Sequence, residues 1–205
     1  MSPTRRDYEP ILRFWFGADP GDPASIALQQ PLWWRSDPAF DSTLRDLFLD
    51  SYQAAARGDL DGWTGEPRGA LALVILLDQL SRNLHRGSAE AFTHDARALA
   101  TAVAAIDAGH DRMLHPPERQ FLYMPFEHAE DLALQHRSVA LFSALVEDAG
   151  PAWRKLTEDA LHWARLHLEI VERFGRFPHR NRLLGRRSTA EEERYLAEGG
   201  PSFGQ

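Results

Sequence analysis

The segment Arg173–Arg187 contains six arginines and no acidic residue, although the whole chain carries 30 Asp and Glu against 23 Lys and Arg. Guanidinium groups bind carboxylates and phosphates through paired hydrogen bonds. A short basic cluster on a chain of net charge −7 therefore predicts one small anionic ligand, or internal carboxylate partners, rather than a nucleic-acid surface.

The order of residues in this segment predicts how it is built. Gly175 is expected to end a long helix, and Pro178 to begin a short one, with His179 in its first turn as a candidate general base. Backbone N–H groups and arginines then meet at a helix start, which favours an anion site. The anion contacts are assigned to Arg173, Arg176, Arg180 and Asn181. The alternative is that the arginines neutralise carboxylates such as Asp78 and Glu127 and tie the last turns to the core.

A second cluster lies on an apolar helix predicted from Arg68 to about His85. Asp78 and Arg82 share one face of this helix at i, i+4, and Asn83 follows directly. A charge on a buried face needs a partner, so one interpretation is an internal Asp78–Arg82 pair. The other is that Arg82 and Asn83 contact an anionic ligand while Asp78 orients the guanidinium.

A third cluster, residues 123–131, combines a tyrosine, a histidine and three acids around Pro125. The acids are predicted to lie in the first turn of a helix after the proline, where they offset the helix dipole. This role is sufficient to explain why acids occur at Glu130 and Asp131. The residues that remain as catalytic candidates, for proton transfer or hydrogen bonding, are Tyr123, Glu127 and His128.

His167 lies at helical spacing from Trp163, on a stripe predicted to face the core. Imidazole and carboxylate groups are suitable ligands for zinc, iron or manganese. The alternative is therefore a divalent metal site built from His128, His167 and a carboxylate, either Glu127 or Glu169. No His-Glu-x-x-His or Glu-x-x-His spacing occurs on the predicted helices, so neither a metal nor another cofactor is assigned.

Composition excludes several kinds of chemistry. The chain has no cysteine, which excludes disulfides, thiolate nucleophiles and cysteine-held iron–sulfur clusters. Lysine occurs once, at Lys155, on a helix rich in ordinary surface residues, so catalysis through a lysine Schiff base is not expected. The first 17 residues show no signal-peptide pattern, and the longest apolar run, Ala70–Leu77, is far shorter than the roughly 20 residues of a membrane span. We expect a soluble, cytoplasmic protein with no membrane contact.

Apolar residues recur at three- and four-residue spacing, and no segment alternates as a half-buried strand does. The chain is predicted to be all-α, with antiparallel helix pairs in a single domain over residues 1–205. Gly150 and Pro151 separate a helix that ends near Asp148 from one of about 24 residues that ends near Gly175. The other predicted helices cover residues 7–16, 24–30, 38–57, 68–85, 88–108 and 116–148, the last with a kink or break at Pro125. A final short helix is predicted to begin with a capping box from Ser188 to Glu191.

Three motifs carry a family resemblance: Asp78–Asn83, Phe121–Glu130 and His167–Asn181. Together with shorter matches elsewhere, they closely resemble the uncharacterised bacterial family catalogued as domain of unknown function 924. The resemblance implies a compact all-α fold of the tetratricopeptide-like superfamily and no established reaction, cofactor or partner. The chain departs from the family pattern at Leu80 and Ser81, where Phe-Pro is common, which puts a proline kink there in doubt.

These observations favour three classes of function. The first is a small-molecule binder or enzyme whose pocket joins the three clusters around a carboxylate or phosphate. The second is an interaction scaffold, in which a groove holds a peptide or a partner helix and Trp33, Trp34 and Trp63 are anchors. The third is the metal site. The first is preferred because the unusual residues converge on three motifs rather than on repeated units, and nucleic-acid binding ranks last.

Overall fold

The computed structural model describes residues 8–201 and 203, and within these residues every regular element is helical. The prediction of an all-α chain is confirmed. The predicted helix start at Asp7 lies outside the described residues. The α-helices are α1 (Glu9–Phe16), α2 (Pro23–Trp33), α3 (Pro38–Arg57), α4 (Pro67–Val74), α5 (Ser81–Leu84), α6 (Asp95–Asp107), α7 (Pro116–Glu127), α8 (Leu132–Asp148), α9 (Arg154–Phe174) and α10 (Ala190–Ala197).

Local signals place several helix ends where the sequence predicts them. The side chain of Asp37 accepts a hydrogen bond from the Phe40 N–H at 2.8 Å and so caps α3. Gly58 closes the same helix in the left-handed region (φ 92°, ψ 5°). Gly175 ends α9 in the same way (φ 69°, ψ 2°), because a residue without Cβ adopts positive φ at little cost.

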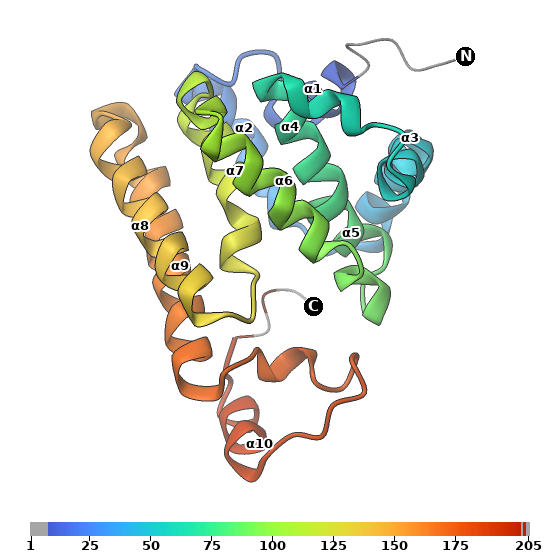
Figure 1. Ribbon diagram of the computed structural model, residues 1–205, viewed down its shortest axis with the longest axis vertical. Helices are drawn as coiled ribbons and strands as arrows, with labels where there is room; N and C mark the ends of the chain where they lie inside the picture. The colour runs from blue at the N-terminus through green and yellow to red at the C-terminus, as the bar shows by residue number, and fades with distance from the viewer. Residues whose placement is uncertain (1–7, 202, 204–205) are drawn as a thin grey trace.

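The most apolar segment forms the centre of the molecule, as predicted. α4 continues through a π-helical stretch, η2 (Ile75–Leu80), into α5, and the backbone stays helical across Leu80 and Ser81. Residues 70–77 are all buried. α3 packs against the η2 and α5 part, while α6 and α7 pack against α4 (Figure 1). This central rod therefore fixes Asp78 and Arg82 in the interior.

Two predicted helices divide differently from what we expected. The helix predicted over residues 88–108 is divided into a short turn, η3 (Ala89–Phe92), and α6. Ser88 caps the turn by accepting a hydrogen bond from the Glu90 N–H. Pro125 does not break α7, which continues to Glu127. The interruption lies at residues 128–131, where Asp131 caps α8 by accepting from the Leu134 N–H at 2.9 Å.

The end of α7 is completed from the next helix. Gln135 in α8 donates its amide N–H to the carbonyl oxygens of Glu127 and Ala129, at 2.7 and 2.8 Å. These carbonyls have no partner inside the helix, so the side chain replaces the missing turn. Glu127 and His128 are therefore held at a helix C-terminus, and the prediction that they lie in a helix N-terminal turn is wrong.

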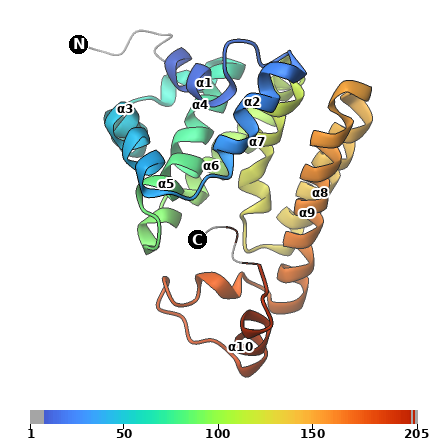
Figure 2. The ribbon, with the colours of Figure 1, turned by 180° about the vertical axis from the view of Figure 1, so that it is seen from behind.

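α8 and α9 form a packed pair beside α7, and the segment from η6 (Pro178–Arg180) to α10 crosses the end of the molecule below α7 and α9 (Figures 1 and 2). The cap of α10 is a true capping box, but it runs from Thr189 to Glu192, one residue later than predicted. No helix among the described residues is long and apolar enough to cross a membrane. The tetratricopeptide-like label stays a prediction.

Candidate functional site

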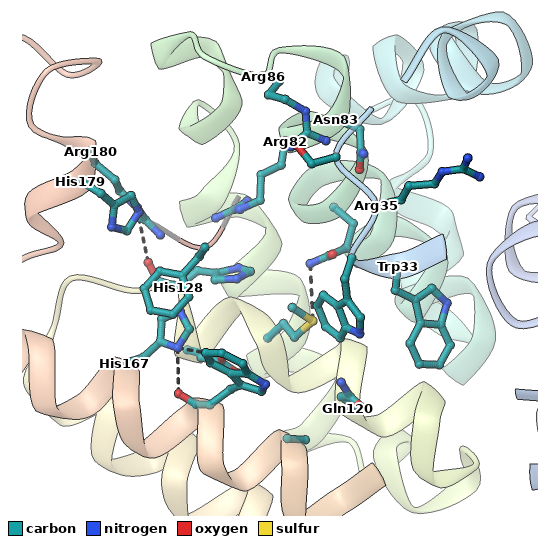
Figure 3. A pocket seen from close by; sticks show the side chains of 18 residues that line it. Trp33, Arg35, Arg82, Asn83, Arg86, Gln120, His128, His167, His179 and Arg180 are labelled. Atoms are coloured by element: carbon teal, nitrogen blue, oxygen red, sulfur yellow. Dashed lines mark hydrogen bonds and ion pairs between the residues drawn. The ribbon is translucent and has the colours of Figure 1, made fainter. Parts of the chain in front are cut away.

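A cavity of about 480 Å³ lies where the central rod, the end of α7, the middle of α9 and the turn η6 approach one another. Figure 3 shows side chains from all of these elements pointing into it, with His179 and Arg180 at one side and Trp33 and Gln120 at the other. Its lining includes Trp33, Trp34, Arg35, Arg82, Asn83, Gln120, Met124, Glu127, His128, Ala160, Trp163, His167, His179, Arg180 and Phe203.

The cavity brings together part of each predicted cluster. The predicted site residues in its wall are Arg82, Asn83, Glu127, His128, His179 and Arg180, and His167 joins them. Asp78 does not line the cavity but contacts two residues that do. The structure places four other predicted residues outside the wall: Tyr123, Arg173, Arg176 and Asn181.

Asp78 is completely buried and holds two cavity residues. Its carboxylate lies 3.0 Å from Arg82 Nη1 and 2.8 Å from His128 Nδ1, so the predicted internal Asp78–Arg82 pair is confirmed. Burial alone would raise the pKa of this carboxyl group, but the charge of Arg82 and the hydrogen bond from His128 outweigh burial and hold the pKa well below its ordinary value. Asp78 is therefore ionised and fixes both side chains.

His128 is arranged as a proton acceptor. Burial and the nearby charge of Arg82 lower the pKa of its imidazole, so the ring is neutral near pH 7. Because Asp78 is ionised, Nδ1–H donates to it and the lone pair lies on Nε2. No hydrogen-bond partner of Nε2 occurs among residues 8–201 and 203. A neutral histidine oriented by a carboxylate is suited to accepting a proton or a hydrogen bond.

A second carboxylate–histidine pair stands beside the first. Glu127 Oε1 lies 2.9 Å from His167 Nδ1, both side chains are buried, and the two imidazole centroids are 6.1 Å apart. His167 Nδ1 is also 2.9 Å from the carbonyl oxygen of Trp163, one helical turn earlier. The prediction that His167 is buried is confirmed. Trp163 is 46% exposed and lines the cavity, so its predicted core position is wrong.

Arg180 is the least compensated charge in the cavity wall. It is 6% exposed, with its guanidinium 4.8 Å from the Phe92 ring and 4.5 Å from the Phe177 ring. Its Nη1 donates to the His128 carbonyl at 3.0 Å and lies 3.6 Å from Asp95, whereas Nε is buried with no partner among the described residues. Burial and the charge of Arg82 lower the pKa of Arg180 to about 10.

The neighbouring side chains share this electrostatic environment. Burial, followed by the charge of Arg180, lowers the pKa of His179 to about 3, so its imidazole is neutral. Arg82 is better compensated, since it pairs with Asp78 and also with both oxygens of Asp95 at 3.0 and 3.1 Å. Beside Asp95, the cavity wall therefore has two adjacent guanidinium groups, and Arg82 is better paired than Arg180.

Three other arginines of the basic segment bind glutamates outside the cavity. Arg173 pairs with Glu191 at 2.9 Å, Arg176 with Glu192 at 2.7 and 2.8 Å, and Arg186 with Glu130 at 2.5 and 2.8 Å. Asn181 donates to Ser188 and accepts from Arg186. The alternative, that arginines tie down the last turns, is therefore correct for these three. The partners named for it are wrong, because Asp78 already pairs with Arg82 and His128, and Glu127 with His167.

Of the two acids expected at a helix N-terminus, Asp131 lies there as the cap of α8, whereas Glu130 pairs with an arginine instead. Asp131 caps α8, and Glu130 accepts from Arg186 and from the Phe177 N–H at 2.8 Å, which holds η6 against the end of α7. Tyr123 is buried away from the cavity and donates its hydroxyl proton to Asp111 at 2.7 Å. Burial and that hydrogen bond raise the pKa of Tyr123 to about 12.

Several cavity residues were not predicted as part of a small-molecule site. Gln120, Trp163 and Phe203 belong to the wall, and Asp95, which lies behind it, pairs with Arg82 and Arg180. Phe203 stacks on His167, with centroids 3.8 Å apart and planes at 23°. The adjacent tryptophans Trp33 and Trp34 were a usable signal, although we interpreted them as peptide anchors.

This geometry gives less support to the two alternative functions, the metal site and the peptide-binding scaffold. Within the part of the chain that the structure describes, no group of three or more His, Asp or Glu side chains is arranged to hold a metal ion. Of the three proposed peptide anchors, Trp63 is buried against Tyr8 and Trp33 donates its indole N–H to the Trp15 carbonyl. Only Trp34 presents a large exposed surface, and it faces the cavity.

Comparison with known proteins agrees with this fold. The chain is similar over 96% of its length to the solved structure of a protein of unknown function from Agrobacterium tumefaciens, at 42% identity and a TM-score of 0.81, and it covers 100% of that protein. No curated protein matches the chain. A family model described as bacterial protein of unknown function, DUF924, matches residues 11–200. The chain therefore belongs to the DUF924 family.

Proposed function

We propose that this protein binds a small organic anion, a carboxylate or a phosphate, with its charge at the side of the cavity formed by Arg82, His179 and Arg180. The observation that carries the proposal is the state of Arg180. Its guanidinium is buried in the cavity wall, one of its N–H groups lacks a partner among the described residues, and its pKa is lowered to about 10.

A buried cation is costly unless an opposite charge and hydrogen bonds compensate it. Asp95 compensates Arg82 at hydrogen-bond distance but lies 3.6 Å from Arg180. A bound anion supplies the missing opposite charge, and a guanidinium donates paired hydrogen bonds to two oxygens of one carboxylate or phosphate. His128 and His179 beside it are neutral and add hydrogen-bonding groups. They do not compete with the anion for the guanidinium, as further carboxylates would.

Thermal unfolding with a panel of small anions tests this proposal. Acetate, propionate, succinate, inorganic phosphate and methyl phosphate are compared with acetamide and propionamide, which lack the charge. A ligand at 100 times its Kd stabilises the folded state by about 2.7 kcal/mol, which for a chain of this size corresponds to roughly 5–10 °C. We expect at least one anion, and neither amide, to raise the Tm.

Three variants locate the effect. Arg180→Met keeps the apolar stem between Phe92 and Phe177 but removes the charge, and it should abolish the Tm increase. Arg180→Lys should retain part of it. Arg173→Met, which alters an exposed arginine outside the cavity, should respond as the wild type does. The proposal is wrong if no anion stabilises the wild type, or if Arg180→Met responds in full.

A further inference from the structure

The wall of the cavity farther from Arg180 has a different chemistry. It is formed mainly by apolar groups, among them Trp33, Trp34, Met124, Ala160 and Trp163. A second cavity of about 270 Å³ adjoins it. The two cavities share five lining residues: Trp33, Trp34, Gln120, Ala160 and Trp163. Figure 3 shows Trp33 and Gln120 on the opposite side of the cavity from His179 and Arg180. A ligand that contacted only Arg82 and Arg180 would leave this apolar wall in contact with water.

Trp34 presents a fixed aromatic surface to both cavities. It is 56% exposed although its indole is stacked on the buried Phe121 ring, with centroids 6.2 Å apart and planes at 18°. The edge of Trp33 packs against it at 6.4 Å and 89°. The neighbouring rings hold the indole in place on one side while a large part of its surface stays exposed. Such a rigid, exposed aromatic surface is ready to stack on a flat group.

Trp163 adds a second exposed indole from another element. It projects from the middle of α9, is 46% exposed, and lines both cavities. Edge contacts hold it, with His162 at 5.5 Å and 62° and with Phe203 at 6.3 Å and 78°. Two large exposed aromatic side chains from α9 and from the end of α2 thus share one cavity wall. Contiguous exposed apolar surface of this kind marks a binding site rather than ordinary solvent-facing surface.

Gln120 is the polar side chain of the wall that the two cavities share. It is 6% exposed, and its Oε1 is buried with no partner among the described residues. The amide oxygen and nitrogen of glutamine exchange places by rotation about the terminal bond. Either orientation offers one hydrogen-bonding group among otherwise apolar neighbours. A ligand body that carries a polar atom gains from meeting this amide, because a buried polar group without a partner is costly.

We infer that the anion is an aryl carboxylate or aryl phosphate, with its charge at Arg180 and an aromatic body of one or two rings against Trp34 and Trp163. This inference rests on the proposed anion site and names its ligand class. A cavity of about 480 Å³ lies within the range of roughly 300–1,000 Å³ that holds small organic ligands. Inorganic phosphate or acetate would fill only the charged side.

A matched series of ligands separates the contribution of the body from that of the charge. Isothermal titration compares acetate, phenylacetate and 1-naphthylacetate, and in parallel inorganic phosphate, phenyl phosphate and 1-naphthyl phosphate. Octanoate supplies a flexible apolar body, and 1-naphthylacetamide supplies the flat body without charge. We expect the naphthyl anion of at least one series to bind about tenfold or more tightly than its parent anion, and more tightly than octanoate or the amide.

Variants assign this gain to the tryptophans. Trp163→Ala should reduce the gain from parent to naphthyl anion by about tenfold while leaving affinity for the parent anion within about twofold. Leu132→Ala, which removes a comparably exposed apolar side chain outside the cavity, should leave the whole series unchanged. Arg180→Met should weaken every anion of the series that binds.

The outcomes distinguish the two proposals. If no anion binds the wild type, or if the amide binds as tightly as the anion, the proposed anion site itself is wrong. If parent anions bind but affinity does not increase with the aromatic body, the site stands and the aryl inference fails. The aryl inference also fails if octanoate gains as much as the naphthyl anion, or if Trp163→Ala leaves the gain intact.

Discussion

Arginines from one short segment fulfil two different tasks. Arg173, Arg176 and Arg186 each face a glutamate at hydrogen-bond distance, and together they hold the chain between α9 and α10. Arg180, from the same segment, is buried among Phe92, Phe177 and Arg82, and among the described residues the one carboxylate within 4 Å of it is that of Asp95, at 3.6 Å. The difference lies in the partners, not in the residue type, so a run of arginines in a sequence does not by itself define an anion site.

The pKa values show the same contrast. Hydrogen bonds from Arg176 lower the pKa of Glu192 to about 2, which means that the ion pair is favourable in the folded protein. Burial and Arg82 lower the pKa of Arg180 to about 10, which means that the folded protein disfavours this charge. The outer arginines therefore contribute to stability, whereas the charge of Arg180 is only partly compensated in the folded protein.

The largest expected effect comes from Asp78, the carboxylate that compensates the cavity. Asp78→Asn leaves the buried Arg82 with an amide in place of a charge and replaces the carboxylate that orients His128 by a neutral group. Removal of one partner from a buried ion pair costs about 3–5 kcal/mol. Urea unfolding at pH 7 measures the loss. Asp159→Asn, which alters an exposed pair with Lys155, is the control and should change stability little. A loss below about 1 kcal/mol in Asp78→Asn would contradict the description of the site.

Glu130 is expected to matter next, because it joins the outer segment to the end of α7. Its carboxylate accepts from the Phe177 N–H and from two nitrogens of Arg186. Glu130→Gln should cost about 2 kcal/mol, the usual loss when charged hydrogen bonds are weakened in a half-buried place. Hydrogen exchange should show faster opening of residues 177–186 than in the wild type. Unchanged protection there would show that the ion pair does not hold the segment.

His179 makes the cavity sensitive to acid. Its pKa is about 3 in the folded protein, against about 6.5 for an ordinary histidine. Between these values the unfolded chain binds a proton that the folded protein does not, so stability falls as the pH falls. From pH 7 to pH 5 the loss amounts to about 2 kcal/mol.

His179→Gln should therefore lose about 2 kcal/mol less than the wild type over this pH interval. Urea unfolding at pH 7 and pH 5 provides the comparison. His136→Gln, which alters an exposed histidine of α8, should follow the wild type. An equal loss in His179→Gln and the wild type would mean that the imidazole is protonated in the folded protein.

The smallest effect is expected for Arg173. Both Arg173 and Glu191 are about half exposed, and such surface pairs contribute roughly 0.2–1 kcal/mol. Arg173→Ala should change stability by no more than that and should leave anion affinity unchanged, as judged by urea unfolding and titration. A tenfold loss of anion affinity in Arg173→Ala would show that the anion binds at the outer arginines and not in the cavity.

Local signals made much of the fold predictable. Gly58 and Gly175 end helices because they adopt the left-handed backbone, and the apolar run near Ala70 lies at the centre because it has no polar face. The helix break after α7 was misplaced because it depends on Gln135, whose side chain replaces the missing turn from the next helix. Sequence spacing contains no information on such a tertiary contact.

The site was predictable only in part, for the same reason. Residue type and clustering identified Arg82, His128 and Arg180, which the fold brings to one cavity. Helical spacing cannot distinguish a cavity wall from a core, so Trp163 was assigned to the core. Asp95 was missed because its two arginine partners lie on other elements.

Isothermal titration of three proteins with one anion tests the central claim most directly. The ligand is whichever of 1-naphthylacetate and 1-naphthyl phosphate the wild type binds more tightly, and the variants are Arg180→Met in the cavity and Arg176→Met outside it. We predict that Arg176→Met binds within about twofold of the wild type, and that Arg180→Met binds at least about tenfold more weakly, a loss of about 1.4 kcal/mol. Equal affinities for Arg180→Met and the wild type, equal losses in both variants, or no binding by the wild type would contradict the account.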